Sequence, residues 1–186
     1  MARKSLKVNK SLVIIGQYLE EARIKRCISL QYLSKYLKIS ETTLASLETN
    51  NSANSILDFL SYICYLKFDD IIVDQLKKYY KVIFFELYNC RIVKSLSTVG
   101  KFFNKLIDYL IIIKNYKKLN NEVVADRAGL SQDLIFEIEN CQNVSLIDFL
   151  SYCNAIGVLD VIVNSLSFRY DEFGNMLAVK KLKEIL

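Results

Sequence analysis

A duplicated segment is the feature of this chain that most restricts what it can fold into. Residues 55–76 read SILDFLSYICYLKFDDIIVDQL and residues 145–166 read SLIDFLSYCNAIGVLDVIVNSL, identical at ten of 22 positions without a gap. Unrelated sequences of average composition would share roughly one or two of these positions. Upstream the offset changes from 90 to 91, where Ser40 matches Ser131 and Glu48 matches Glu139. Most of the chain is therefore predicted to consist of two copies of one module.

The apolar pattern within the first copy predicts helices. Leu12, Ile15 and Leu19 recur at steps of three and four residues, the spacing of one face of an amphipathic helix. Three serines are predicted to cap the second, third and fourth helices, namely Ser29, Ser40 and Ser55. The second helix is expected to carry Tyr32, Leu33, Tyr36 and Leu37. Only two residues, Lys38 and Ile39, separate it from the third, which predicts a helix-turn-helix.

Both copies match the residue spacing of a known family. The matching residues of the first copy are Gly16, Leu19, Arg23, Ser29, Leu33, Ile39, Ser40, Leu44, Leu47 and Glu48. Those of the second copy are Leu110, Lys114, Val124, Ala125, Gly129, Leu130, Ser131, Gln132, Ile135, Ile138 and Glu139. The chain thus resembles the Cro and lambda-repressor-like, or XRE-type, family of phage repressors and bacterial regulators. The resemblance implies a mainly α fold of two tandem five-helix helix-turn-helix domains, residues 10–78 and 99–168, with double-stranded DNA as the partner.

The segments that follow each module leave two alternatives open. Residues 79–98 are predicted to connect the modules and residues 169–186 to form a C-terminal tail. The connector is rich in β-branched and aromatic residues, and a Gly-Asn turn lies within residues 171–175, so each module is expected to end in a short β-hairpin. The alternative is one continued helix over residues 70–96.

Composition excludes several classes of protein. The 186 residues include no histidine and only five glycines, and no GxSxG, HExxH, Walker or GxGxxG motif occurs. We therefore expect no enzyme activity, no cofactor and no metal. Five cysteines without a CxxC pair predict small buried hydrophobes, not disulfides or a zinc site. No apolar run approaches the roughly 18 residues of a membrane span, so a protein that stays inside the cell is expected. The resemblance implies a cytoplasmic, nucleoid-associated protein encoded by a bacterium or phage.

The third helix of the family enters the major groove, so the resemblance assigns the DNA-reading residues of the first copy. The short, mostly neutral candidates are Ser29, Gln31, Ser40, Glu41, Thr42, Thr43, Ser46 and Thr49. The basic N-terminal arm adds Arg3 and Lys4 to these candidates, and Lys7 and Lys10 follow them along the arm. The arm is expected either to track DNA phosphates or to be a solvated tail.

The corresponding residues of the second copy suit DNA less well. They are Asn121, Gln132, Asp133, Leu134, Phe136 and Glu137. Asp133 and Glu137 oppose the phosphate field, whereas an exposed Leu134 and Phe136 suit a protein interface. The net charge of the two halves of the chain differs in the same direction, because residues 1–98 carry +6 and residues 99–186 carry −1. This surface is expected to be an interface or a second, weaker DNA site.

These patterns together predict a sequence-specific transcriptional regulator that acts as a homodimer. The first module is expected to read DNA, and the second to mediate dimerisation or partner contact. Both modules could instead supply half-sites within one chain, but the acidic helix of the second copy argues against this. The alternative from another class is an interaction protein, or an antagonist, that keeps the helix-turn-helix fold without binding DNA.

Overall fold

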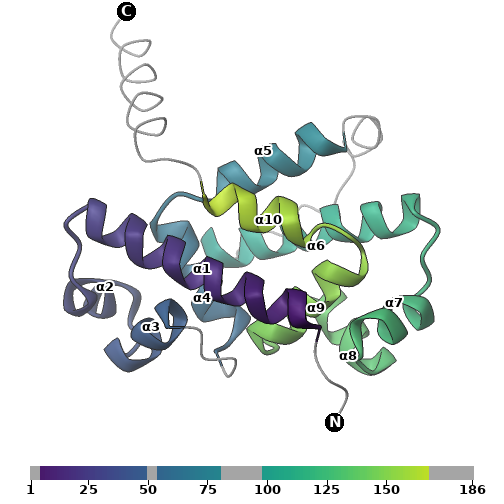
Figure 1. Cartoon of the computed structure of the whole chain (residues 1–186), viewed down its shortest axis with the longest axis horizontal. Helices are drawn as coiled ribbons and strands as arrows, with labels where there is room; N and C mark the ends of the chain where they lie inside the picture. The colour runs from purple at the N-terminus through teal and green to yellow at the C-terminus, as the bar shows by residue number, and fades with distance from the viewer. Residues whose placement is uncertain (1–4, 50–53, 81–97, 168–186) are drawn as a thin grey trace, which may run out of the picture.

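Helices make up most of the backbone in the computed structural model of this chain, which describes residues 5–49, 54–80 and 98–167 (Figure 1). The helices of the first module are α1 (Leu6–Lys25), α2 (Leu30–Leu37), α3 (Glu41–Glu48), α4 (Ile56–Tyr65) and α5 (Asp69–Tyr79). Those of the second module are α6 (Thr98–Tyr116), α7 (Asn121–Ala128), α8 (Gln132–Glu139), α9 (Leu146–Ala155) and α10 (Leu159–Leu166). Over the described ranges there is no strand, which confirms the prediction of a mainly α protein.

The caps of the helices repeat from one module to the next. Ser40 begins α3 by accepting a hydrogen bond from the backbone N–H of Thr43, and Ser131 begins α8 in the same way through Leu134. Ser55 and Ser145 likewise cap α4 and α9. Short polar side chains at these positions satisfy backbone donors that each helix leaves unpaired, so they fix where the helices begin.

Residues with left-handed backbone conformation occur at equivalent positions of the two modules, as the capping serines do. Cys27 and Lys118 follow the first helix of each module, with φ of 54° in both. Lys38 and Gly129 follow the second, with φ of 58° and 64°, and Lys67 and Gly157 follow the fourth, with φ of 61° and 76°. Because side chains make this conformation unfavourable, its recurrence in both modules shows that the backbone itself is duplicated.

A short antiparallel contact joins the two modules at equivalent positions. Ser55 and Ser145 form an isolated β-bridge just before α4 and α9. The N–H of Ile56 donates to the carbonyl of Val144 at 2.9 Å, and the N–H of Leu146 donates to that of Asn54 at 2.7 Å. Exchanging the two modules exchanges these two bonds, so a pseudo-two-fold axis runs through the bridge.

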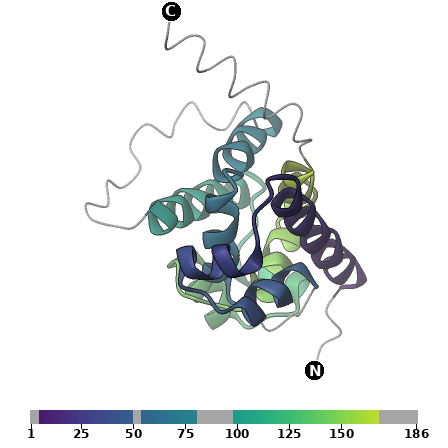
Figure 2. The same cartoon turned by 90° about the vertical axis from the view of Figure 1, so that its left-hand side faces the viewer.

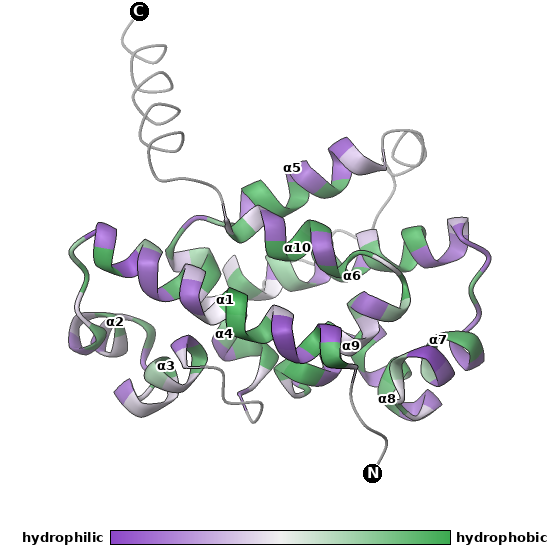
Figure 3. Ribbon diagram, viewed as in Figure 1, coloured by the Kyte–Doolittle hydropathy of each residue, from purple (hydrophilic) through white to green (hydrophobic). Residues whose placement is uncertain are grey.

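The modules interleave around this axis. The last helices, α5 and α10, pack against each other, and α4 contacts α9. The first helix of each module crosses to the other, so α1 packs on α9 and α10 while α6 packs on α4 and α5 (Figure 1). Apolar residues, green in Figure 3, gather where α1, α9 and α10 meet. The buried hydrophobic residues of both modules form one cluster, so the modules share a core.

Several element boundaries differ from those expected. α1 begins at Leu6, behind the cap Ser5, so Lys7 and Lys10 are helical residues and not part of an arm. α5 ends at Tyr79, and at Tyr80 the backbone has left the helix, with φ of −119° and ψ of 38°, so a continuous helix over residues 70–96 does not form. The remaining residues of the expected hairpins, 81–97 and 168–186, lie outside the described residues.

α2 carries the four residues expected on the second helix, which are Tyr32, Leu33, Tyr36 and Leu37. Leu33 is buried, whereas Tyr32 and Tyr36 are exposed. The rings of Tyr36 and Tyr65 of α4 meet edge to face, with their centroids 4.9 Å apart.

The described cysteines also include both buried and exposed side chains. Cys64 and Cys153 are buried, as predicted, and burial raises the pKa of the Cys64 thiol to about 12. Cys27 is exposed, because it occupies the left-handed turn after α1. Cys90 lies outside the described residues.

Candidate nucleic-acid interface

α2 and α3 form a compact corner in which three residues, 38–40, connect the helices. Lys38 turns the chain with left-handed backbone, and Ser40 starts the next helix. Leu33 of α2 and Leu44 of α3 are fully buried, and α3 also packs against α1. The opposite side of α3 therefore faces away from the core, where its N-terminal residues reach solvent.

Ser40 gathers three of the predicted DNA-reading hydroxyls into one network. Its Oγ lies 2.8 Å from Thr42 Oγ1 and 2.7 Å from Thr43 Oγ1, and it accepts from the backbone N–H of Thr43 at 3.0 Å. Ser29 caps α2 in the simpler way, accepting from the N–H of Tyr32 at 3.1 Å. The hydroxyl network orients Thr42, which is exposed, at the first turn of α3.

The structure separates the remaining candidates of the first module by exposure. Gln31, Glu41 and Thr49 are exposed, whereas Thr43 and Ser46 are partly buried. Ser46 Oγ lies 2.9 Å from the carbonyl of Thr43 and 2.5 Å from Asn54 Oδ1, so the expectation that Ser46 is an exposed contact is wrong. Thr49 donates to the carbonyl of Ala45 at 2.8 Å.

The expected basic arm is shorter than the sequence suggested. Arg3 and Lys4 lie outside the described residues. Lys7, on the first turn of α1, forms an ion pair with Asp160 of α10 at 2.7 Å. Both side chains are exposed, so the pair contributes little stability, but it directs Lys7 toward the second module.

The second module presents a different set of side chains in the equivalent place. Gln132 and Asp133 are exposed on α8, as is Phe136, with 62% of its surface accessible. Leu134 is partly buried against the core of its own module, so the expectation of an exposed Leu134 is wrong. Glu137 is also partly buried, and Asn121 Oδ1 accepts from Lys114 Nζ at 2.5 Å.

Charge distinguishes the two corners. In addition to one internal glutamate in each, residues 29–49 carry Lys35, Lys38 and Glu41. Residues 120–140 carry Arg127 and four acidic residues, which are Glu122, Asp126, Asp133 and Glu137. The first corner is therefore the more positive of the two, which is the sign of charge that phosphates attract.

A buried cation, carboxylate and tyrosine hold α3 and α8 to their modules. In the first module Glu48 binds Arg23 through two bonds, Nε to Oε1 at 2.6 Å and Nη2 to Oε2 at 2.8 Å, and accepts from Tyr62 Oη. In the second, Glu139 Oε1 accepts from Lys114 Nζ at 2.6 Å and from Tyr152 Oη at 2.9 Å. Sequence reasoning missed these triads, although the matched glutamates and tyrosines of the repeat were a usable signal.

The triads shift the ionisation of their tyrosines. Burial, reinforced by the hydrogen bond to Glu48, raises the pKa of Tyr62 well above its ordinary value. Burial and the charge of Glu139 do the same to the pKa of Tyr152. Both phenols therefore stay protonated and act as permanent donors to the carboxylates, so the triads are structural parts of the corner.

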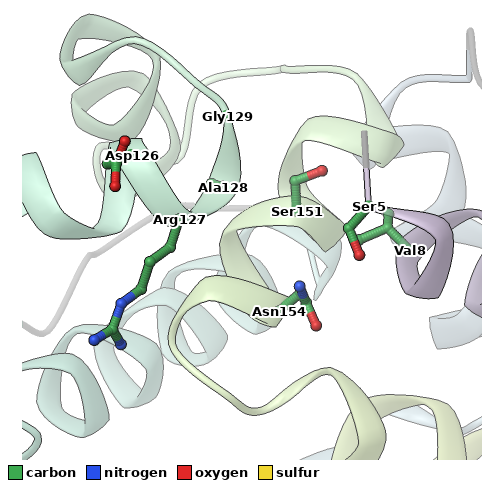
Figure 4. A pocket seen from close by; sticks show the side chains of 8 residues that line it. All are labelled: Ser5, Val8, Asp126, Arg127, Ala128, Gly129, Ser151 and Asn154. Atoms are coloured by element: carbon green, nitrogen blue, oxygen red, sulfur yellow. The ribbon is translucent and has the colours of Figure 1, made fainter. Parts of the chain in front are cut away.

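A shallow pocket of about 220 Å³ lies between the N-terminal end of α1 and the helices α7 and α9 (Figure 4). Ser5 and Val8 line one side, and Asp126, Ser151 and Asn154 line the other. The Arg127 side chain points away from Ser5 and Asn154, and Ser151 Oγ donates to the carbonyl of Ile147 at 2.7 Å. The Ser151 hydroxyl is therefore bonded to the backbone of its own helix. Among the described residues, no group of three or more acidic or cysteine side chains is placed to hold a metal ion.

Comparisons with protein-family models, with curated proteins and with solved structures found no match to this chain. No helix in the described ranges has the length and apolar character needed to cross a membrane.

Proposed function

We propose that this chain is a DNA-binding transcriptional regulator with a helix-turn-helix in each module, and that the corner of α2 and α3 makes the specific contacts. The observation that carries the proposal is the geometry of this corner: two short helices joined by three residues, 38–40, with Glu41 and the Ser40-bonded Thr42 exposed at the start of the second helix. Such a regulator would act in the cytoplasm, where bacterial and phage DNA lies.

Charge supports the same assignment. Lys35 and Lys38 flank this corner and are exposed, so they are available to phosphates. Glu41 begins the reading helix, where a carboxylate can accept a hydrogen bond from cytosine. Arg3 and Lys4 would add phosphate contacts of the N-terminal arm.

The proposal is tested by measuring DNA affinity at two salt concentrations with duplexes selected from a random-sequence library. We expect affinity to fall steeply with salt and Thr42→Ala to weaken specific binding by about 1 to 3 kcal/mol. The control is Gln132→Ala, at the position of the second module that corresponds to Glu41, which should have a smaller effect. If no duplex is bound at low salt, the proposal fails.

The second candidate is a protein-interaction module that does not bind DNA. One observation favours it, namely the exposed Phe136 among the acidic residues Asp133 and Glu137 on α8. An interaction protein of this kind would show no salt-dependent binding to duplex DNA.

A further inference from the structure

The pseudo-two-fold axis through the Ser55–Ser145 bridge gives α3 and α8 equivalent places. Figure 1 shows the corner of α2 and α3 and the corner of α7 and α8 at opposite ends of one edge of the molecule. Figure 2, turned by 90°, keeps both corners at the same level, below α5. One chain therefore presents two candidate reading helices on the same side, an arrangement that other DNA-binding proteins obtain by pairing two identical chains.

The surface through which identical modules would pair is already occupied within the chain. α5 packs on α10, α4 contacts α9, and the bridge joins the loops ahead of α4 and α9. α1 and α6 then cross between the modules, each covering the two last helices of the other. The second module takes the place that a second copy would hold.

The two helices differ at nearly every position that reaches solvent. At the offset of 91, Glu41 corresponds to Gln132 and Thr42 to Asp133. Farther along the helices, Ala45 corresponds to Phe136. Side chains of different chemistry generally favour different base pairs, so equivalent placement does not imply equivalent half-sites.

We infer that one copy of the chain takes the role of a two-fold dimer on duplex DNA, and that its site consists of two unlike half-sites. This inference rests on the proposed function. α3 supplies the attractive contacts at one half-site. α8 lies against the other, where Asp133 and Glu137 weaken the hold on the phosphates and so limit total affinity.

The first test is the stoichiometry of the complex, measured by sedimentation of the full chain with a labelled duplex from the selected set. We expect the protein to be a single chain in solution and to bind as one chain per duplex. The stretch of DNA that it protects should span two half-sites whose sequences are not inverted repeats of each other. Two chains on a palindromic site would overturn the inference and leave the proposed function intact. Absence of binding to any duplex at low salt would overturn both.

The second test places α8 against the DNA. The double variant Asp133→Asn/Glu137→Gln removes two negative charges and should bind the same duplex about fourfold more tightly, with a steeper dependence on salt. The control Asp70→Asn/Asp74→Asn changes the net charge equally on α5, away from both corners (Figure 1), and should leave affinity within about twofold of the parent. Circular dichroism verifies that both variants keep their helices. Equal affinities of the two double variants would show that α8 does not lie against DNA.

Discussion

The two modules share the residue types of their buried positions but differ in the side chains that they present to solvent. Leu44 and Ile135 are both fully buried at the offset of 91, and the triad of cation, glutamate and tyrosine recurs at the same places in each module. At positions of the same helices that reach solvent, Asp133 takes the place of Thr42 and Phe136 that of Ala45. Packing and internal hydrogen bonds thus explain what the modules share, whereas binding must be sought where they differ.

The cation of the triad is an internal difference between the modules that alters the chemistry. Arg23 binds Glu48 through two nitrogens and also donates to the carbonyl of Ile28 at 2.9 Å. Lys114 binds Glu139 through its single nitrogen, which also donates to Asn121. A guanidinium matches a carboxylate with two parallel bonds and an ammonium does not, so the two triads should respond differently when they are broken.

The largest expected effect comes from removing the glutamates. Glu48→Ala leaves Arg23 charged and unpaired, with only 11% of its side chain exposed, and should lower the free energy of unfolding by about 3 to 5 kcal/mol. Glu139→Ala should cost less, because the Lys114 ammonium forms one bond to Glu139 where the Arg23 guanidinium forms two to Glu48. Urea unfolding of both variants measures the difference, with Glu20→Gln on the surface of α1 as control. Equal losses from the two substitutions would contradict this contrast between the modules.

The shared core leads to the second prediction. Leu76 is fully buried on α5, which packs against α10 and α6, so Leu76→Ala should lower the free energy of unfolding by about 3 kcal/mol. Because the modules interleave, we expect one unfolding transition in which both modules melt together. Tyrosine fluorescence and circular dichroism should give the same midpoint. Two separate transitions, one of them unaffected by the substitution, would mean that the modules are stable independently.

A smaller effect is expected at the turn between α2 and α3. Lys38 has φ of 58°, and its counterpart Gly129 has φ of 64°. Because glycine adopts this backbone without steric cost, Lys38→Gly should raise the free energy of unfolding by about 1 kcal/mol. Lys35→Gly, inside α2, removes the same charge but should destabilise by about 1 kcal/mol. Thermal unfolding of the two variants shows whether each is more or less stable than the parent. Destabilisation by Lys38→Gly would show that the turns at Lys38 and Gly129 are not equivalent.

The smallest effect concerns Asp69, at the start of α5. Its Oδ1 atom is buried without a hydrogen-bond partner among the described residues, and burial, followed by the charge of Asp70, raises its pKa. A carboxyl group whose pKa is raised by folding stabilises the fold at low pH, and this contribution is lost as the pH rises through the folded-state value. Asp69→Asn should therefore gain about 0.5 kcal/mol at pH 7 and flatten the stability profile in acid. Asp74→Asn, exposed on the same helix, should leave that profile unchanged.

The repeat allowed most of the architecture to be predicted from the sequence. Serine caps at matched positions fix the starts of α3, α4, α8 and α9, because capping is a local interaction. The crossing of α1 and α6 between modules could not be predicted, since periodicity shows which face of a helix is buried but not which partner covers it. For the same reason the sequence suggested two separate domains.

Predictions for the candidate interface were less complete. Exposure of Thr42 and Phe136 followed from helical spacing, which places them opposite the buried leucine and isoleucines. Ser46 was misjudged because its partner Asn54 lies in a loop, and Leu134 because its long side chain folds back on the core. Both errors concern residues at the edge of a helical face, where spacing alone does not decide burial.

The exchange of first helices has a consequence for how the chain matures during synthesis. Val8 of α1 is 1% exposed in the finished fold, where α1 packs on α9 and α10, both formed by the last part of the described sequence. A nascent chain that has released only the first module would therefore expose part of the apolar face of α1 until residues 146–166 leave the ribosome. During this interval the growing polypeptide is open to chaperones and to aggregation, and maturation of the N-terminal half awaits translation of the C-terminal half.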